Sequence, residues 1–507
     1  MAMPSLPIPS VPVLSTDEAL ALEAGLFGGD ERKEWKAMVQ AGRSVGQGIL
    51  RDFEEIGGFP PGGRILVLAG KGNNTGDALV AAREVLERHP RADADILFAF
   101  GPRSLKPLAA RAWRGLTEGV RGRVRSIGAE SLPWGYDLCL CGIIGFRYRP
   151  PLPPEAAAAI EASSRCSVRF RAAVDLPTGW SEPGAFRADF TYATGSVKTP
   201  LLGCANAGRP RYLDLGFFPG GAGEEATSGD RVILPSVLRP LASLRRASSD
   251  KRSQGHLFIV AGSGGYPGAA MMATLAALRS GVGLVTAFVP KSLVPEFASR
   301  APEAMWVGMP ETPAGGLALG GLAQVMEIIK RASALAIGPG LGRDPETLAL
   351  ALGIVKASTV PLVIDADALQ PDIVRAGSIA RIVTPHEGEF SRIAKGASLR
   401  ELAVAVHGTV VLKGPVTRVT DGGAVYHSFF GGPVLARGGS GDILAGLVGG
   451  LLAQEASNPL VCACRGAAWH GMAADVLARS RGQTAVQVSQ ILDCLGPALK
   501  EAAEPPA

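Results

Sequence analysis

The stretch HLFIVAGSGGYPGAAMMATLAALRSGVGLVTAFV (residues 256–289) contains one complete unit of an α/β fold. An apolar run comes first, a glycine-rich turn follows at 261–270, and an apolar helical segment leads to a second apolar run. Short apolar runs that alternate with helical segments are typical of parallel strands joined by crossover helices. The stretch therefore predicts a strand, a turn, a helix and a second strand.

The same alternation continues on both sides of this stretch. Strands are predicted at 64–70, 94–101, 136–144, 171–179, 334–340, 361–367, 381–386 and 409–414. One helix is expected at 76–89, another is expected to begin at the cap-like Ser15, and residues 1–16 are expected to be extended. We therefore predict an α/β protein with mostly parallel sheets covered by helices.

A change in composition divides the chain. Residues 217–230 are rich in Gly and acidic, and residues 238–252 are basic and rich in Ser. Such segments are typical of a boundary between domains. We predict two domains, at 12–216 and 232–500, joined by a linker at 217–231.

The composition limits the classes of function. The chain has 507 residues, of which 47% are hydrophobic and 66 are Gly, so a large core with many tight turns is expected. The net charge of +5 comes from 51 basic and 46 acidic residues, which favours a mixed, solvated surface over nucleic-acid binding. The seven cysteines include no C-x-x-C pair and indicate neither a disulfide framework nor a zinc site.

The N-terminus and the apolar runs bear on location. The N-terminal sequence lacks the charged and apolar regions of a signal peptide, and no run reaches the ~18 apolar residues of a membrane span. We expect a cytoplasmic protein that binds neither membranes nor nucleic acids. We also expect it to form a homo-oligomer.

One carboxylate has an unusual position in LARGGSGDILAGLVGGLL (435–452). Asp442 follows four small residues at the start of an apolar helical segment. Free amides at a helix N-terminus bind anions, so a loop that only held a phosphate would not place a carboxylate there. Asp442 can instead accept the proton of a hydroxyl that attacks a phosphoryl group. The alternative is an ordinary N-cap aspartate.

Other strand ends carry further glycine-rich or charged loops. They lie at 261–270, 338–342 (GPGLG), 384–390 (TPHEGEF) and 412–417 (LKGPVT). Each could be a tight turn by itself, Glu389 could assist a helix cap, and His386 could be a core histidine. Together they lie at the carboxyl ends of strands, where ligands bind in open parallel sheets.

These motifs, together with VIDADAL (363–369), resemble the ADP- or ATP-dependent NAD(P)HX dehydratases of the ribokinase-like fold over residues 232–500. The resemblance implies repair of NADH and NADPH that carry a hydroxyl at C6 of the nicotinamide ring. Phosphorylation converts this hydroxyl into a leaving group that the ring nitrogen can expel. A small-molecule kinase of the same fold is the alternative for this half.

The resemblance also implies residue roles. Asp442 would be the catalytic base, and Glu389 would organise Mg²⁺ through water. NADHX or NADPHX would contact Ala269, Gly340 and His386. ADP would contact Lys413, Gly414, Pro415, Val416, Thr417, Gly439, Ser440, Gly441 and Asp442. Arg437 replaces a small or hydroxylated residue; it adds positive charge beside the phosphate loop and should be tolerated.

The first half contains another glycine turn before a helix, LAGKGNNTGDALVAAREV (68–85). A tight turn would explain it, but Asn73, Asn74 and Asp77 add oxygen atoms that suit a hard cation. Over residues 12–216 this half resembles the NAD(P)HX epimerases, which interconvert the R and S hydrates. The two resemblances together imply a Rossmann-like three-layer αβα domain followed by a ribokinase-like αβα domain.

The epimerase resemblance implies a second set of site residues. The catalytic acid or base would be Asp175. The hydrate would contact Asn73, Asn74, Asp77, Gly145, Arg147 and Asp175. K⁺ would be held by Asn74, Thr178 and the side chain at position 141.

This half departs from the family pattern at several of these places. Cys141 replaces an aspartate that would ligate K⁺, and a thiol prefers soft metals. Thr75 and Ala78 replace glycines, while Phe146 and Arg147 replace a small phosphate-binding turn, although Arg147 could meet a phosphate by charge. Two hypotheses stay open: an epimerase with an altered ion site, or a nucleotide-binding or structural module without catalysis.

Overall fold

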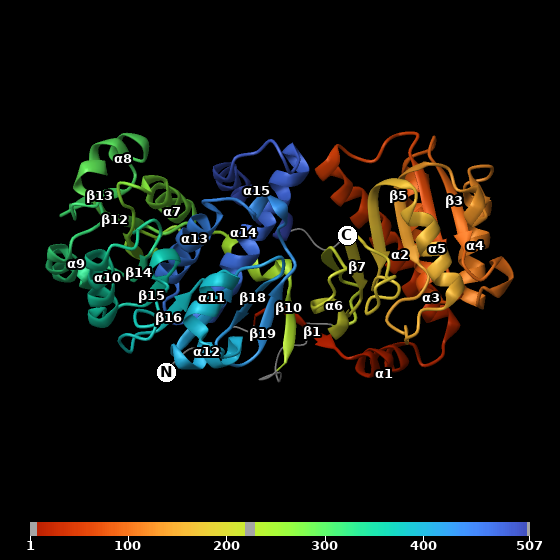
Figure 1. Cartoon of the computed structure of the whole chain (residues 1–507), viewed down its shortest axis with the longest axis horizontal. Helices are drawn as coiled ribbons and strands as arrows, with labels where there is room; N and C mark the ends of the chain where they lie inside the picture. Colours follow the sequence, from red (N-terminus) through yellow and green to blue (C-terminus); the bar gives the residue numbers. More distant parts are fainter. Residues whose placement is uncertain (1–7, 219–228, 504–507) are drawn as a thin grey trace. The chain divides into compact units, whose positions relative to one another are not determined.

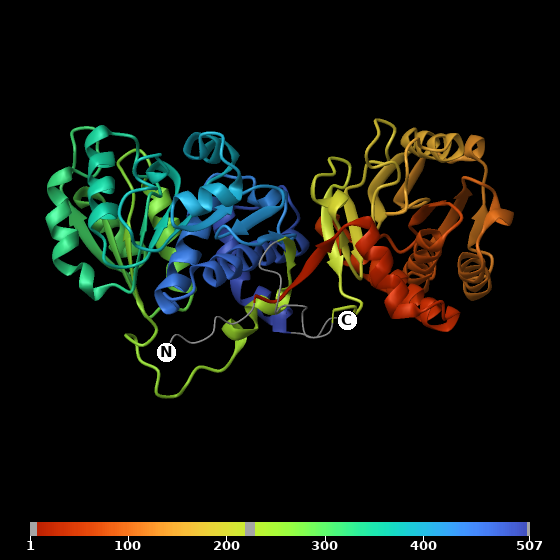
Figure 2. The ribbon, with the colours of Figure 1, turned by 90° about the horizontal axis from the view of Figure 1, so that it is seen from below.

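The computed structural model describes residues 8–218 and 229–503, which form two compact units (Figure 1). The N-terminal unit consists mainly of residues 11–222, and the C-terminal unit consists mainly of 223–477 and 484–505. Most of the linker predicted at 217–231 lies outside the described residues. The predicted α/β class with two domains is confirmed, because helices cover a largely parallel sheet in each unit (Figures 1 and 2).

The sheet of the C-terminal unit has the strand order β13-β12-β11-β14-β15-β16-β17-β18-β19-β10. The pairs from β13 to β17 are parallel, and β18 is antiparallel to both of its neighbours. The strands are β10 (Asp230–Ile233), β11 (His256–Val260), β12 (Leu284–Pro290), β13 (Met305–Met309), β14 (Ala334–Ile337), β15 (Leu362–Ile364), β16 (Arg381–Val383), β17 (Gly408–Leu412), β18 (Thr417–Thr420) and β19 (Val425–Ser428).

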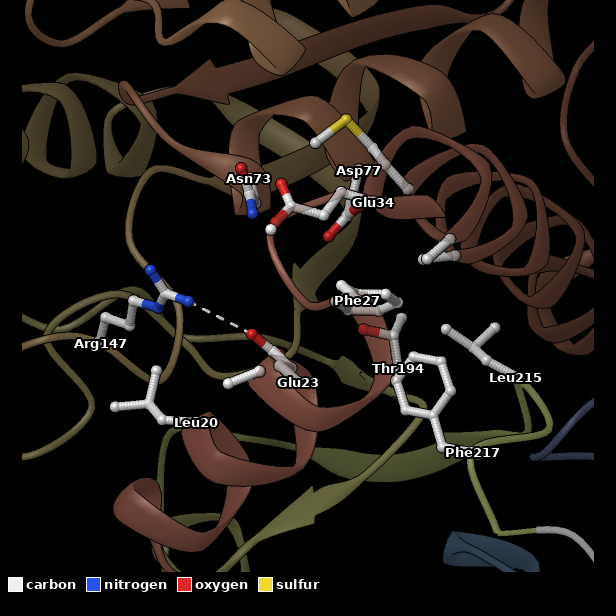
Figure 3. Close-up of a pocket in the computed structure, with 15 residues that line it drawn as sticks. Leu20, Glu23, Phe27, Glu34, Asn73, Asp77, Arg147, Thr194, Leu215 and Phe217 are labelled. Carbon is white, nitrogen blue, oxygen red and sulfur yellow. Dashed lines mark hydrogen bonds and ion pairs between the residues drawn. The ribbon is translucent and has the colours of Figure 1, made fainter. Parts of the chain in front are cut away.

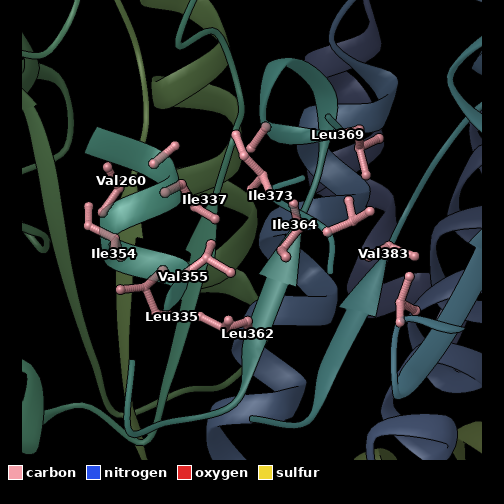
Figure 4. Close-up of a cluster of buried hydrophobic side chains, with 14 of the residues drawn as sticks. Val260, Leu335, Ile337, Ile354, Val355, Leu362, Ile364, Leu369, Ile373 and Val383 are labelled. Atoms are coloured by element: carbon pink, nitrogen blue, oxygen red, sulfur yellow. The ribbon is translucent and has the colours of Figure 1, made fainter. Parts of the chain in front are cut away.

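Helices pack on both faces of this sheet. They are α7 (Pro267–Arg279), α8 (Val294–Arg300), α9 (Leu322–Ile328), α10 (Pro345–Ala357), α11 (Glu387–Ala394), α12 (Leu399–Ala405), α13 (Ser440–Gln454), α14 (Pro459–Arg481) and α15 (Ile491–Ala503). Alternate strand residues such as Leu335, Ile337 and Ile364 join Ile354 and Val355 of α10 in one buried cluster (Figure 4). Small residues let α13 approach the other face, where a Cβ on Gly449 would lie 3.1 Å from Leu257.

The sheet of the N-terminal unit has the order β4-β3-β2-β5-β6-β7-β9, and all of its pairs are parallel. The strands are β2 (Arg64–Ala69), β3 (Asp93–Phe98), β4 (Val124–Ser126), β5 (Gly135–Gly142), β6 (Ser167–Val174), β7 (Phe190–Thr194) and β9 (Arg209–Leu213). Two short strands, β1 (Ser10–Leu14) and β8 (Val197–Lys198), also pair in parallel.

The helices of the N-terminal unit also lie on two faces. They are α1 (Thr16–Phe27), α2 (Glu31–Phe53), α3 (Asn73–Arg88), α4 (Pro107–Gly119), α5 (Pro154–Ser164) and α6 (Thr199–Leu202). Buried side chains of α2, α3 and α4 form one cluster with Ile65, Val67 and Leu140, and those of α5 form another with Leu66 and Cys139. This alternation along β2 and β5 is what a sheet covered on both faces requires.

The expected elements are present, with shifted ends. The helix predicted after Ser15 is α1, where Ser15 and Glu18 form a capping box. The helix predicted at 76–89 starts three residues earlier, at Asn73, because Thr75 ties its first turn to the sheet. The strand predicted at 171–179 stops at Val174, since the backbone of the next residue, Asp175, turns to φ 64°. Among the described residues, no helix is both long and apolar enough to cross a membrane.

Candidate functional site

The strand order places two crossover points at the carboxyl edges of the sheets. In the C-terminal unit, β11 lies between β12 and β14. The connection after β11 leads to β12 on one side, and the connection after β14 leads to β15 on the other. In the N-terminal unit, β2 lies between β3 and β5 in the same way. Ligands bind at such reversals, because the loops after the two neighbouring strands diverge and leave a crevice. We define the two candidate sites by these loops.

Ala269 and Gly340 meet at the crossover of the C-terminal unit. The Gly262 amide donates to the Pro339 carbonyl at 2.8 Å, and the Ser263 hydroxyl donates to the Gly340 carbonyl at 2.8 Å. A Cβ on Gly340 would lie only 2.8 Å from the Cβ of Ala269. The structure therefore brings these two predicted residues into contact, and only glycine fits at 340.

Lys413 joins three loops of the same edge. The backbones of His386 and Lys413 form a parallel bridge, and the Lys413 amide donates to the Pro385 carbonyl at 2.8 Å. A Cβ on Gly441 would lie 3.2 Å from the Lys413 ammonium nitrogen. The loops after β16 and β17 therefore meet the start of α13 at this lysine.

Asp365 is a site residue to which the sequence assigned no role. It follows β15, is 1% exposed, and accepts hydrogen bonds on Oδ1 from Lys413 Nζ at 2.9 Å and from Thr384 Oγ1 at 2.7 Å. Its Oδ2 lies 3.8 Å from a Cβ placed on Gly441. The available signal was its position directly after an apolar strand, the same signal that pointed to Asp175.

Asp442 is the third residue of α13 and does not cap it. The N-cap residue is Gly439, and no side chain caps this helix. The N-cap interpretation of Asp442 is therefore wrong. Burial, together with the nearby charges of Asp365 and Asp367, raises the pKa of Asp442 to about 6, and the charge of Lys413 opposes this rise. A carboxylate with this pKa is ionised at neutral pH and is still basic enough to take a proton.

The segment Lys413–Thr417 links β17 to β18 and leaves Gly414 and Pro415 exposed. Burial alone would lower the pKa of Lys413, but the carboxylates of Asp365, Glu389 and Asp442 reverse this and raise it. The lysine therefore carries its charge at neutral pH. An exposed turn that ends on a fixed cation suits the phosphates of a nucleotide.

His386 and Glu389 form a capping box at the start of α11. His386 Nδ1 accepts the Gly388 and Glu389 amides at 3.0 and 3.3 Å, and Glu389 accepts the His386 amide at 2.8 Å. Glu389 also lies 3.8 Å from Lys413. Among the described residues, no group of three His, Cys, Asp or Glu side chains is arranged to hold a metal.

The guanidinium of Arg437 binds backbone carbonyls, a role that its charge alone did not predict. Its guanidinium donates to the carbonyl of Val486 at 2.5 Å and to that of Thr484 at 2.8 Å. The side chain thus fastens the phosphate loop to the segment before α15. The chain therefore tolerates Arg437 because the guanidinium has carbonyl partners of its own.

The crossover of the N-terminal unit gathers the second set of predicted residues. Thr75 Oγ1 accepts the Gly70 amide at 2.7 Å and donates to the Gly142 carbonyl at 2.8 Å, which joins the turn after β2 to the end of β5. A Cβ on Gly145 would lie 2.9 Å from Asn74 Oδ1 and 3.1 Å from Asp175 Oδ2. The replacement of glycine by Thr75 is thus accommodated by two hydrogen bonds.

Asp175 forms a buried ion pair. Lys198 Nζ lies 2.5 Å from Asp175 Oδ1, and the exposed fractions of the two side chains are 3% and 6%. The Phe146 amide donates to Asp175 Oδ2 at 3.1 Å, and the Lys198 ammonium lies over the Phe146 ring at 4.8 Å. The lysine and the amide therefore fix the position of the Asp175 carboxyl group.

Two of the three residues predicted for K⁺, Cys141 and Thr178, do not fit that ion. Cys141 Sγ lies 3.4 Å from Thr178 Oγ1, and Thr178 already bonds the Ile144 amide and carbonyl at 3.0 and 2.9 Å. Burial raises the pKa of the Cys141 thiol, so it stays neutral. A neutral sulfur and a hydroxyl that is already used do not replace the oxygen ligands and the negative charge that K⁺ needs.

Two adjacent cavities open around these residues. The larger, of about 600 Å³, is lined by Asn74, Gly145, Phe146, Asp175 and Lys198 among others, so space remains beside Phe146. The smaller, of about 380 Å³, lies against α1 and α2 (Figure 3). Five residues line both: Glu23, Asn73, Asp77, Arg147 and Thr194. Arg147 pairs with Glu23 at 3.3 Å and so contributes a cation at the shared wall.

Profiles of protein families match both halves of the chain. A profile described as NAD(P)H-hydrate dehydratase matches residues 257–496, and one described as YjeF-related protein N-terminus matches residues 36–199. The chain is 33% identical over 490 residues to a bifunctional NAD(P)H-hydrate repair enzyme of Moorella thermoacetica, covering 90% of this chain and 91% of that protein. It is 37% identical over 491 residues to the enzyme of the same name from Gloeobacter violaceus, covering 90% and 92%.

Solved structures also resemble the C-terminal half. An ADP/ATP-dependent NAD(P)H-hydrate dehydratase from Bacillus subtilis, co-crystallised with ATP and Mg²⁺, is 28% identical and covers 52% of this chain and 96% of its own, with a TM-score of 0.46. A ribokinase-like superfamily protein from Enterococcus faecalis is 25% identical and covers 54% and 96%, with a TM-score of 0.47.

Proposed function

The chain belongs to the family of bifunctional NAD(P)H-hydrate repair enzymes, and we propose how its two sites divide that work. The C-terminal site, centred on Asp442 and Lys413, dehydrates the S hydrate at the expense of ADP or ATP. The N-terminal site, centred on Asp175, interconverts the R and S hydrates. Family membership supports repair over the alternative of a small-molecule kinase.

Dehydration requires a base beside a phosphoryl group. In the proposed reaction, Asp442 takes the proton from the C6 hydroxyl as its oxygen attacks the terminal phosphorus of the nucleotide. The amides at the start of α13, from Gly439 to Gly441, face the charge on the transferred group. The ring nitrogen lone pair then expels phosphate, and loss of a C5 proton restores the dihydronicotinamide. One observation carries this role: Asp442 lies in the first turn of α13 without capping the helix, Lys413 acts on it electrostatically, and its own pKa is raised.

The remaining predicted contacts involve residues at the same carboxyl edge of the sheet. The nucleotide lies along Lys413–Thr417, with its phosphates between the lysine and the start of α13. The hydrated ring lies toward Ala269, Gly340 and His386. Glu389 would hold Mg²⁺ through water, and the ion would offset the charge of the phosphates. Asp365 positions Lys413 by its ion pair and so holds the cation at the phosphate loop.

The N-terminal half retains a site that suits epimerisation. The buried pair of Asp175 and Lys198 and a cavity of about 600 Å³ at the crossover support catalysis over a purely structural module. Arg147 offers the charge that the replaced phosphate turn would have supplied through its amides. We propose that this half works without K⁺, because Cys141 and Thr178, two of its three expected ligands, do not fit the ion.

A mixture of R and S hydrated NADH tests both halves. The purified chain receives the mixture with ADP and Mg²⁺, NADH absorbance is followed, and spontaneous epimerisation is recorded in parallel. Rapid recovery of both hydrates is expected. Recovery of the S portion alone, with the R portion at the spontaneous rate, would contradict the epimerase. Consumption of ADP on another alcohol without NADH would contradict the dehydratase.

A further inference from the structure

Asp77 occupies the boundary between the two cavities of the N-terminal unit. It belongs to α3 and lines both the larger and the smaller cavity. Figure 3 shows Asp77 among the residues that line the smaller cavity, which include Glu23, Glu34 and Arg147. Within the described residues, the Asp77 side chain forms no hydrogen bond or ion pair. An unpaired carboxyl group that faces two cavities is available to a ligand in either one.

The charges around Asp77 favour its neutral form. The groups that line the same cavities are the acids Glu23, Glu34, Glu155 and Asp175 and the cations Lys71, Lys106, Arg147 and Lys198. Lys198 is engaged by Asp175 and Arg147 by Glu23. Burial raises the pKa of Asp77 well above its usual range, the anions Asp175 and Glu23 raise it further, and Lys198 only partly opposes them. The two carboxyl groups therefore differ in their surroundings, because Asp175 is paired with Lys198 and Asp77 has no such partner.

We propose that Asp77 is the proton donor of the epimerase half, and that Asp175, paired with Lys198, is the second carboxyl group of the reaction. This assignment rests on the proposed epimerase function and gives each carboxyl group one role. Inversion at C6 requires the hydroxyl to leave from one face of the ring and water to return to the other. A donor at the boundary of two connected spaces can serve both events, because water can occupy either side of it.

The step balances without any other reactant. Asp77 gives its proton to the C6 hydroxyl, the C6–O bond breaks, and water leaves as the N1 lone pair forms the N1=C6 double bond of an iminium cation. The carboxylate of Asp175 faces this cation and stabilises it. Water adds to the opposite face of C6, the N1=C6 double bond returns to a lone pair, and the extra proton returns to Asp77.

The test uses the full chain and the R hydrate of NADH, with its own dehydratase reporting the S hydrate as NADH. Asp77→Asn keeps the shape of the side chain and removes its proton. We expect the enzymatic epimerisation rate to fall on the order of 10²–10⁴-fold, with dehydration of the S hydrate unchanged. Asp17→Asn, at an exposed aspartate of the same unit, is the matched control and should leave both rates unchanged.

Two further readouts separate a proton donor from a binding group. In water labelled with ¹⁸O, each enzymatic inversion of the wild type should place label at the C6 oxygen. Infrared difference spectra of the wild type minus Asp77→Asn should show a protonated carboxyl band at neutral pH, with or without turnover. An unchanged epimerisation rate in Asp77→Asn, or the absence of that band, would overturn the assignment. A wild type that does not exceed the spontaneous rate would instead overturn the epimerase function itself, and the assignment with it.

Discussion

Lys413 Nζ lies 2.9 Å from Oδ1 of Asp365, a carboxylate that is 1% exposed and follows a different strand. The pair fixes the Lys413 ammonium group close to the start of α13. The negative charge of Asp365 also raises the pKa of Asp442. The carboxylate thus acts on the proposed base in two ways, through Lys413 and directly. This arrangement makes the pH dependence of the dehydratase a test of the site.

Dehydration should rise with pH through about 6 and level off above it, because a base with a pKa of about 6 is protonated below that pH. Asp365→Asn removes a negative charge that raises the pKa of Asp442, so the acid limb of kcat/KM should move to lower pH. The profile is measured from NADH absorbance with the S hydrate. A limb that stays in place or moves to higher pH would show that Asp442 is not the titrating base.

Asp442→Asn should lower the rate of dehydration on the order of 10²–10⁴-fold, the usual contribution of a general base. Epimerisation of the R hydrate, measured directly by chromatography, should stay at the wild-type rate because it occurs in the other unit. Asp421→Asn, at an exposed turn of the same unit, is the control. Loss of activity in the control as well would point to misfolding. Full activity in Asp442→Asn would show that Asp442 is not the base.

Replacement of K⁺ by a bulky organic cation should leave the epimerisation rate unchanged, because the neutral Cys141 thiol and the engaged Thr178 hydroxyl do not form an alkali site. Cys141→Asp adds a buried carboxylate there. This variant should gain a K⁺-dependent rise in Tm that the wild type lacks. A wild-type rate that depends on K⁺ would show that Cys141 is tolerated as a ligand position.

Arg147→Ala should raise the KM for the R hydrate by about tenfold with a smaller change in kcat, because one charged contact to a phosphate contributes about 1–2 kcal/mol. Loss of the arginine should also weaken the salt dependence of KM. The neighbouring exposed Arg149 offers the matched variant, Arg149→Ala, which should change neither. Equal effects of both substitutions would show that Arg147 acts only through the general surface charge.

Arg437→Ser should lower Tm by a few degrees, since it removes hydrogen bonds from a guanidinium to two carbonyls, a loss of about 1–3 kcal/mol. The KM for ADP should change little, because the guanidinium is directed to the 484–486 segment. Thermal unfolding and nucleotide titration measure the two quantities. A raised KM for ADP at an unchanged Tm would restore the view that Arg437 supplies charge to the phosphate.

The sequence by itself determined the class of fold and the edge of the sheet at which the chemistry occurs. Apolar runs alternate with helical segments in a way that only parallel sheets covered by helices can bury, and the carboxyl ends of parallel strands lie at one edge. Asp442, Lys413, His386 and Asp175 could therefore be placed at that edge from their positions after strands or before helices. Their spacing along the chain was sufficient for this.

Only the tertiary structure decided which partners each side chain has and how they shift its pKa. Asp365 binds Lys413 across 48 positions of sequence, and Cys141 meets Thr178 across 37, because the order of strands in a sheet is not written in the local pattern. The pKa of Asp77 is raised by its burial and by Asp175 and Glu23, which come from distant segments. Protonation depends on the summed field and desolvation of such neighbours, and these exist only after the strands have assembled.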